Sequence, residues 1–228
     1  MERLLSTLKD EIATGVRLYP IFIGLAAITI FTGTANIAYM FLGLSLLLLI
    51  PAAVMFSNYL LPKLATLLRL PESSWTVTAN TQCLLDATKE SGAAIPMVPS
   101  YWLTATTFIS VYLMKNAYDL YNKDTGSADV AKTSARKSQS IIAIVAVLVF
   151  TVVLMVARIS PVFRSTVTRI ACESPLGVVV GIGLGYGLAQ AIYSYMVDCT
   201  GLRNADLFGI AGRIIQVRDN GVACYPVS

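Results

Sequence analysis

Long uncharged runs alternate with short polar segments along the chain. No charged residue occurs from 18 to 62, from 138 to 157 or from 174 to 197. A helix of about 20 apolar residues crosses a hydrocarbon core of about 30 Å, and helices satisfy their own backbone hydrogen bonds inside lipid. The pattern therefore predicts an all-α, polytopic membrane protein.

The first uncharged run is too long for one crossing. As a single helix, its 45 residues would extend about 67 Å, so we expect the run to fold back on itself. The best turn chemistry lies at Gly33-Thr34-Ala35-Asn36, because glycine and asparagine tolerate turn conformations. This predicts spans over about 18–34 and 37–61, with a kink at Pro51 inside the second.

Three further spans bring the expected total to about five within a single domain, 1–228. They cover about 99–117, 138–157 and 174–197. The fourth span is rich in Ile and Val, and we expect it to face lipid. The extramembrane parts are a loop over 63–98, with a short helix at 79–90, and a polar tail over 198–228.

The first 17 residues carry apolar side chains at helical spacing, namely Leu4, Leu5, Leu8, Ile12 and Val16. This spacing predicts an interfacial amphipathic helix that leads into the first span. A secretory signal peptide is the alternative, with 18–32 as its apolar region. Three acidic residues in the leader and a second apolar run directly after it argue against that alternative.

Glycines recur in the last span at every fourth position. Gly177, Gly181 and Gly185 form one row, and Gly183 with Gly187 forms a second. Rows of small residues let two membrane helices approach closely, so both rows are expected to pack against other helices, with this span as the centre of the bundle. A potassium-channel filter also contains Gly-Tyr-Gly, but a filter is a re-entrant loop, whereas these glycines lie in the middle of a span.

Composition supports this class and disfavours most chemistry. The chain is 56% hydrophobic and 13% charged, whereas soluble domains contain about 25% charged residues. The net charge of +4 is spread over all loops, which suits anionic lipid and argues against nucleic acid as a partner. No histidine and no recognisable cofactor or metal motif occurs, so we expect a protein that is not an enzyme and holds no cofactor.

Hydroxyl side chains gather in the third span, at Thr104, Thr106, Thr107 and Ser110. Such hydroxyls bond back to their own helix or across to a neighbour, which favours a buried packing face. The alternative is an ion channel or small-molecule carrier with a polar path lined by these residues and Gln190. Ion-coupled carriers need ionisable groups along their path, and no span has one in its middle.

The expected topology limits the pairing of the four cysteines. Cys199 and Cys224 fall on one side of the membrane, and Cys83 and Cys172 on the other. A disulfide between Cys199 and Cys224 would hold the tail. Cys83 with Cys172 is the other pairing that does not cross the membrane, and free thiols are the alternative.

The tail contains an apolar group at helical spacing, with Leu207, Phe208, Ile210 and Ile214 as candidates for partner contact. Packing of the same residues against the end of the bundle is the equal alternative.

Several short motifs in the second half of the chain resemble one known family. They are Pro99-Ser100-Tyr101-Trp102-Leu103, Asn116-Ala117-Tyr118-Asp119-Leu120-Tyr121, the glycine-rich 181–187, Asp206-Leu207-Phe208-Gly209-Ile210 and Cys224-Tyr225-Pro226. In their order and spacing, the chain resembles an uncharacterised family of small multi-span membrane proteins of nucleocytoplasmic large DNA viruses, including those of algae.

The resemblance implies a structural protein of the virion's internal membrane, which derives from the host endoplasmic reticulum. It implies contact with capsid or other virion proteins through the loop and the tail, and allows a homo-oligomer. Ordinary compartments oxidise thiols on one side of a membrane only. Such viruses carry their own thiol oxidases, so this restriction on the cysteines would be weaker. The family supplies no catalytic residues.

Overall fold

The computed structural model describes residues 2–78, 94–96, 99–122, 130–159, 174–200 and 206–208. Helices make up almost all of this, which confirms the all-α class. The elements in order are α1 (Glu2–Thr34), α2 (Ile37–Leu44), the π-helix η1 (Ser45–Leu49), α3 (Ile50–Leu67), the 3-10 helix η2 (Glu72–Ser74), β1 (Thr76–Thr78), β2 (Ala94–Pro96), α4 (Tyr101–Asn122), α5 (Val130–Ile159) and α6 (Pro175–Thr200). The two short strands pair antiparallel, with Val77 opposite Ile95. The short helix expected at 79–90 lies outside the described residues.

Within the described residues, three helical segments are long and apolar enough to cross a membrane. They are Ile37–Leu67, Thr133–Val156 and Pro175–Cys199, and a shorter apolar helix covers Leu18–Thr34. Lengths and compositions of this kind are those of a membrane protein.

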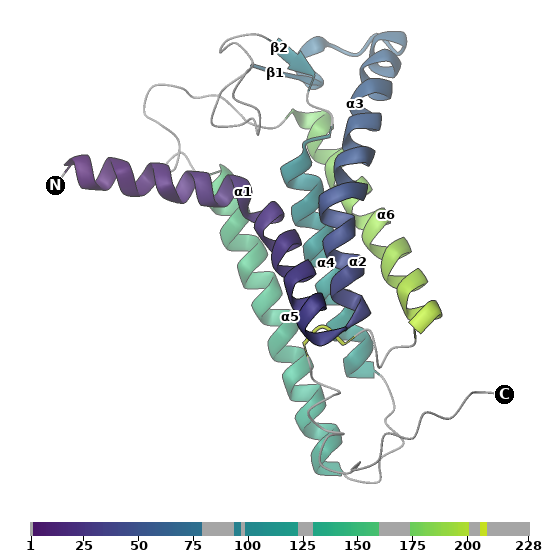
Figure 1. The fold of residues 1–228 in the computed structure, drawn as a ribbon. Helices are drawn as coiled ribbons and strands as arrows, with labels where there is room; N and C mark the ends of the chain where they lie inside the picture. Colours follow the sequence, from purple (N-terminus) through teal and green to yellow (C-terminus); the bar gives the residue numbers. More distant parts are fainter. Residues whose placement is uncertain are drawn as a thin grey trace.

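Helix α1 changes direction near its middle. Its N-terminal part projects sideways from the bundle, and its second part runs alongside α2 (Figure 1). Pro20 lies inside this helix, where its ring and its missing N–H favour a kink. The backbone is helical from Glu2. The side chains of residues up to Ala13, which include most of the expected amphipathic face, lie outside the described side chains.

The first uncharged run folds back at Ala35 and Asn36. Ala35 has a φ of 52°, and its amide bonds to the Phe31 carbonyl at 2.7 Å, which closes the end of α1. The Asn36 side chain accepts from the Ala38 amide at 3.0 Å and so caps α2. The helix break therefore falls within the turn expected at 33–36.

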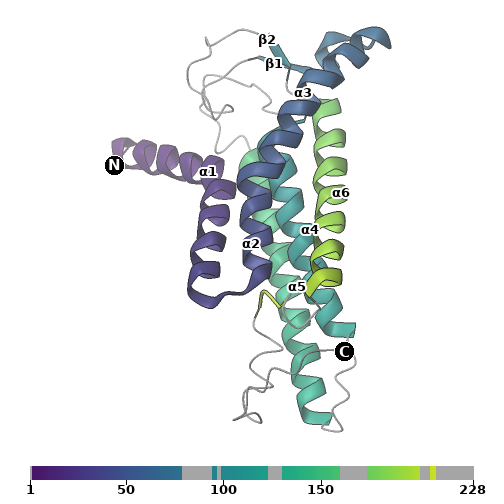
Figure 2. The ribbon, with the colours of Figure 1, turned by 45° about the vertical axis from the view of Figure 1, so that its right-hand side comes forward.

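The central helix of the bundle is α4, and the expectation that the glycine-rich α6 would be the centre is wrong. In both ribbon views, α4 has α6 on one side and α5 on the other, with the α1–α2 hairpin beside it (Figure 2). Its buried residues are Trp102, Leu103, Thr104, Ala105, Thr106, Phe108, Ile109, Ser110, Tyr112, Asn116, Ala117 and Leu120. A helix with protein around it has no need of a fully apolar surface, which explains why α4 is not among the three most apolar helices.

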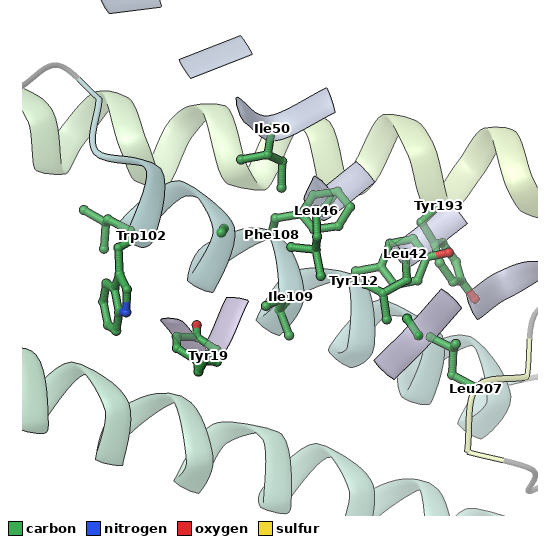
Figure 3. Close-up of a cluster of buried hydrophobic side chains, with 14 of the residues drawn as sticks. Tyr19, Leu42, Leu46, Ile50, Trp102, Phe108, Ile109, Tyr112, Tyr193 and Leu207 are labelled. Carbon is green, nitrogen blue, oxygen red and sulfur yellow. The ribbon is translucent and has the colours of Figure 1, made fainter. Parts of the chain in front are cut away.

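Figure 3 shows the core that α4 organises. Phe108 and Tyr112 of α4 stack with ring centroids 5.6 Å apart, and Tyr193 of α6 meets Tyr112 edge-on at 5.5 Å. Leu42, Leu46 and Ile50, from the α2–α3 segment, complete this cluster (Figure 3). In contrast, α5 exposes Ile142, Val149, Val152, Val153 and other apolar side chains, as expected for a helix that faces lipid.

Candidate functional site

Helix α6 approaches the backbone of α4 closely at Gly185. Gly177, Gly181 and Gly185 are buried. A Cβ built on Gly185 would lie 2.5 Å from the Thr104 carbonyl oxygen and 3.1 Å from the Phe108 amide nitrogen. Because these atoms belong to backbone, they have little freedom to move aside, and only glycine fits. At Gly181 the same Cβ would lie 3.4 Å from the Thr104 hydroxyl, an ordinary contact.

The second glycine row does not pack within the described part of the chain. Gly183 and Gly187 are exposed, and a Cβ added to either would meet nothing within 4 Å. Two residues along a helix correspond to about 200° of rotation, so residues 183 and 187 lie almost opposite to the row formed by 181 and 185. The expectation that both rows pack against neighbouring helices of this chain is therefore wrong for the second row.

A second glycine contact, between α1 and α2, was not expected from the sequence. A Cβ on Gly43 would lie 2.6 Å from the Ile28 side chain and 3.0 Å from the Gly24 carbonyl oxygen. A Cβ on Gly24 would lie 2.9 Å from Leu47. Neither glycine belongs to a four-residue repeat, so only the pairing of the two helices reveals the contact.

Three of the four hydroxyl residues expected to pack in α4 are buried and bonded, whereas Thr107 is only partly buried. Thr104 donates to the Ser100 carbonyl at 2.8 Å, Thr106 to the Trp102 carbonyl at 2.7 Å, and Ser110 to the Thr106 carbonyl at 2.8 Å. Two of these hydroxyls also bond across helices. Thr106 accepts from Tyr19 of α1, and Ser110 lies 2.7 Å from the Thr151 hydroxyl of α5. These side chains form the buried packing face expected of them.

Pro20 leaves a backbone carbonyl of α1 without its usual donor. In an α-helix the carbonyl of residue 16 accepts from the amide of residue 20, but proline has no N–H. The Trp102 indole fills this position by donating to the Val16 carbonyl at 2.7 Å. The ring of Tyr19 meets Trp102 edge-on, with centroids 5.7 Å apart. The kink in α1 is thus held by the first turn of α4.

Pro51 creates the same problem in the α2–α3 segment. Ile50 donates five residues back, to the Ser45 carbonyl, which leaves the Leu46 carbonyl without the Ile50 amide. Pro51 follows and has no N–H to offer. The Tyr101 hydroxyl donates to the Leu46 carbonyl at 3.2 Å. At the kink expected beside Pro51, the chain forms a π-helical turn with a neighbouring donor, because the wider turn accommodates the proline ring.

The two donors, Tyr101 and Trp102, are adjacent residues at the start of α4. Ser100 fixes this start, because its hydroxyl accepts from the Leu103 amide at 3.2 Å, an N-cap. Aromatic residues near span ends commonly form a belt at the membrane surface. Trp102, Tyr19 and Tyr193 instead lie inside the bundle and are 4%, 9% and 1% exposed. Their polar atoms serve partners inside the bundle, whereas Tyr59 and Tyr195 remain exposed.

A polar cluster at the other end of α4 holds the segment 206–208. Asn36 of the helix turn donates to the Asp206 carbonyl at 3.0 Å, and the Tyr39 hydroxyl donates to the Leu207 carbonyl. The Asn116 side chain of α4 accepts from the Leu207 amide at 3.3 Å. Asn116 also donates to the Tyr193 hydroxyl of α6 at 3.4 Å. Asn116 thus joins α4, α6 and the segment 206–208, and the start of α2 holds the same segment through Asn36 and Tyr39.

This arrangement corrects the expected partner-contact surface. Leu207 is 6% exposed and lies in the core beside Tyr193 and Tyr112 (Figure 3). It packs back on the bundle, which was the alternative to partner contact. Phe208 is partly buried, and Ile210 and Ile214 lie outside the described residues.

Cys199, near the end of α6, is an exposed free thiol. Cys224 lies outside the described residues, so the disulfide expected between Cys199 and Cys224 stays a prediction. The part of the chain that the structure describes contains no group of three or more acidic, cysteine or histidine side chains placed to hold a metal ion.

No family model, curated protein or solved structure matches the chain.

Proposed function

We propose that this protein is a non-enzymatic structural protein of a membrane, in which a five-span bundle presents its ends to partner proteins. The observation that carries the proposal is the way α4 uses its polar groups. The hydroxyls of Thr104, Thr106 and Ser110 bond to backbone carbonyls of α4 itself. Tyr101 and Trp102 serve carbonyls that prolines leave free. Groups committed to bonds inside the bundle support packing rather than transport.

The proposed five spans are the second half of α1, the continuous α2–α3 segment, α4, α5 and α6. Helix α4 joins the three most apolar helices as a span because it is surrounded by them, and membrane helices in a bundle interior tolerate hydroxyl and amide groups. The N-terminal part of α1, which projects from the bundle (Figure 1), is proposed to lie along the membrane surface. Its apolar positions, such as Leu5, Leu8 and Ile12, would face the lipid.

The location that we propose is the internal membrane of a virion, and this rests on the sequence resemblance alone. The partners in this proposal are capsid or other virion proteins, with lipid around the bundle. Because Leu207 is buried, the contact surface of the tail is proposed to begin after Phe208, at Ile210 and Ile214, together with the loop over 63–98.

Location and transport can be tested separately. Antibodies against the chain should detect it in purified particles, in the membrane fraction that remains with capsid proteins after mild detergent treatment. Proteoliposomes with the purified protein should show no more ion or solute flux than empty liposomes. Absence from particles would overturn the viral location, and flux above the empty control would favour a channel or carrier over a structural protein.

A further inference from the structure

Within the part of the chain that the structure describes, one buried arginine has two guanidinium nitrogens without a hydrogen-bond acceptor. Arg136 of α5 is 3% exposed, and its Nε and Nη1 atoms are enclosed without a hydrogen-bond acceptor. One helical turn further on, Ser140 is 0% exposed, and its hydroxyl is also enclosed without a partner. Burying an unpaired charge is expensive, so an arginine in this position calls for an anion.

Arg136 and Ser140 belong to the face of α5 that packs against α4. Val147 and Thr151 continue the same stripe at helical spacing, and Thr151 lies within hydrogen-bonding distance of Ser110 in α4, at 2.7 Å. The acidic residue of α4, Asp119, pairs with Lys115 at 3.1 Å. Among the described residues, no carboxylate pairs with Arg136.

The site lies near the N-terminal end of α5, three residues inside the apolar segment Thr133–Val156. Arg136 precedes the uncharged run 138–157 by two residues, so it falls at the edge of the proposed fourth span. The neighbouring Lys137 is exposed, and its ammonium nitrogen lies 5.6 Å from the centre of the Tyr121 ring. Basic and aromatic side chains together are typical of the headgroup level of a bilayer.

We propose that Arg136 and Ser140 form a binding site for a phosphate group, and that an anionic lipid supplies it. The planar guanidinium offers several N–H donors to phosphate oxygens, and a hydroxyl one turn away supplies a further donor. Because Arg136 is only 3% exposed, its long side chain rotates outward when the phosphate group binds. The anion then satisfies donors that are otherwise buried without partners.

The test uses the full-length protein in neutral detergent, with phosphatidic acid, phosphatidylcholine or inorganic phosphate added, and native mass spectrometry to count the bound molecules. The wild type should retain phosphatidic acid in preference to phosphatidylcholine. Arg136→Gln should weaken this binding about tenfold or more, since hydrogen bonds to charged groups are strong. Ser140→Ala should weaken it less.

Lys137→Gln is the matched control, because it removes one positive charge at the next residue. It should leave most of the binding intact. Equal losses in Arg136→Gln and Lys137→Gln would mean diffuse surface charge and would overturn the site. Binding of inorganic phosphate as tightly as phosphatidic acid would overturn the lipid as the source, and failure of the wild type to prefer phosphatidic acid would overturn the whole proposal.

A thermal measurement covers the case in which Arg136→Gln does not fold. Arg136→Met removes the buried charge and keeps an unbranched apolar stem. In neutral detergent this variant should unfold at a higher temperature than the wild type, since replacing buried charges by apolar groups is often stabilising. Phosphatidic acid should raise the unfolding temperature of the wild type and leave that of the variant unchanged. The same rise in both proteins would contradict the proposal.

Discussion

The Trp102 indole donates a hydrogen bond of 2.7 Å to the Val16 carbonyl, the carbonyl that Pro20 deprives of its helical donor. The adjacent Tyr101 hydroxyl does the same for the Leu46 carbonyl, which the π-helical turn before Pro51 leaves free. Unsatisfied backbone groups are costly in a membrane interior, and helices with prolines depend on neighbours to satisfy them. The first turn of α4 therefore holds both bends of the N-terminal hairpin in place.

Replacing Trp102 by Phe should destabilise the protein by at least about 0.5–2 kcal/mol, because the donor to Val16 is lost and the smaller phenyl ring leaves part of the buried space unfilled. The measurement is the unfolding free energy in detergent. Trp75→Phe is the control, since it makes the same change of ring at a tryptophan whose Nε1 atom is buried without a partner, so no hydrogen bond is lost there. In a Pro20→Ala background, the new amide can donate to Val16, so Trp102→Phe should cost less there. An equal cost in both backgrounds would contradict the role assigned to the indole.

Tyr101→Phe tests the second bend in the same way. The Leu46 carbonyl loses its donor, and a loss of about 0.5–2 kcal/mol is expected. Tyr59→Phe is the control, because Tyr59 is 65% exposed. Pro51→Ala restores an N–H beside the π-helical turn and should reduce the effect of Tyr101→Phe in the double variant. Additive losses would show that the proline and the hydroxyl act independently.

Gly185→Ala should destabilise the contact between α4 and α6 by about 1–3 kcal/mol, since an added methyl group in a tight contact forces backbone to shift. The new Cβ would lie 2.5 Å from the Thr104 carbonyl oxygen. Gly187→Ala makes the same chemical change on the exposed face of the same helix, where nothing lies within 4 Å. Unfolding midpoints of the two variants should differ clearly, with Gly187→Ala equal to or above the wild type because alanine favours helix. Equal midpoints would count against the close approach.

The sequence predicted the helical class and the turn after the first span because both depend on local properties. Uncharged runs set helix lengths, and the Asn36 side chain caps the helix that follows it. The glycine repeat indicated close packing, and the buried row that includes Gly181 and Gly185 does face α4. The sequence could not show which of the two glycine rows faces protein, because that depends on how α6 is rotated in the bundle.

The central position of α4 was not predicted because hydropathy ranks helices by their contact with lipid. A helix surrounded by protein can carry polar side chains such as Thr104, Asn116 and Tyr112 when they have hydrogen-bond partners. Its mean hydropathy is then lower than that of a helix that faces lipid. The roles of Tyr101 and Trp102 were missed for a related reason. Their partners are carbonyls 55 and 86 residues earlier in the chain, respectively, and only the tertiary structure brings them together. The prolines were the available signal, since each removes a donor that some neighbour must replace.

Asn116→Ala should release the segment 206–208 from the bundle. The variant loses the acceptor for the Leu207 amide and the donor to Tyr193. Hydrogen exchange followed by mass spectrometry should therefore show faster exchange in peptides that contain Leu207, since the local opening becomes easier by about 1–3 kcal/mol. Asn122→Ala is the matched control, because Asn122 lies on the same helix and its side chain donates to the carbonyl of Tyr118 in its own turn. Exchange at Leu207 should stay at the wild-type rate in that control, and the same rate in Asn116→Ala would mean that packing of the Leu207 side chain alone holds the segment.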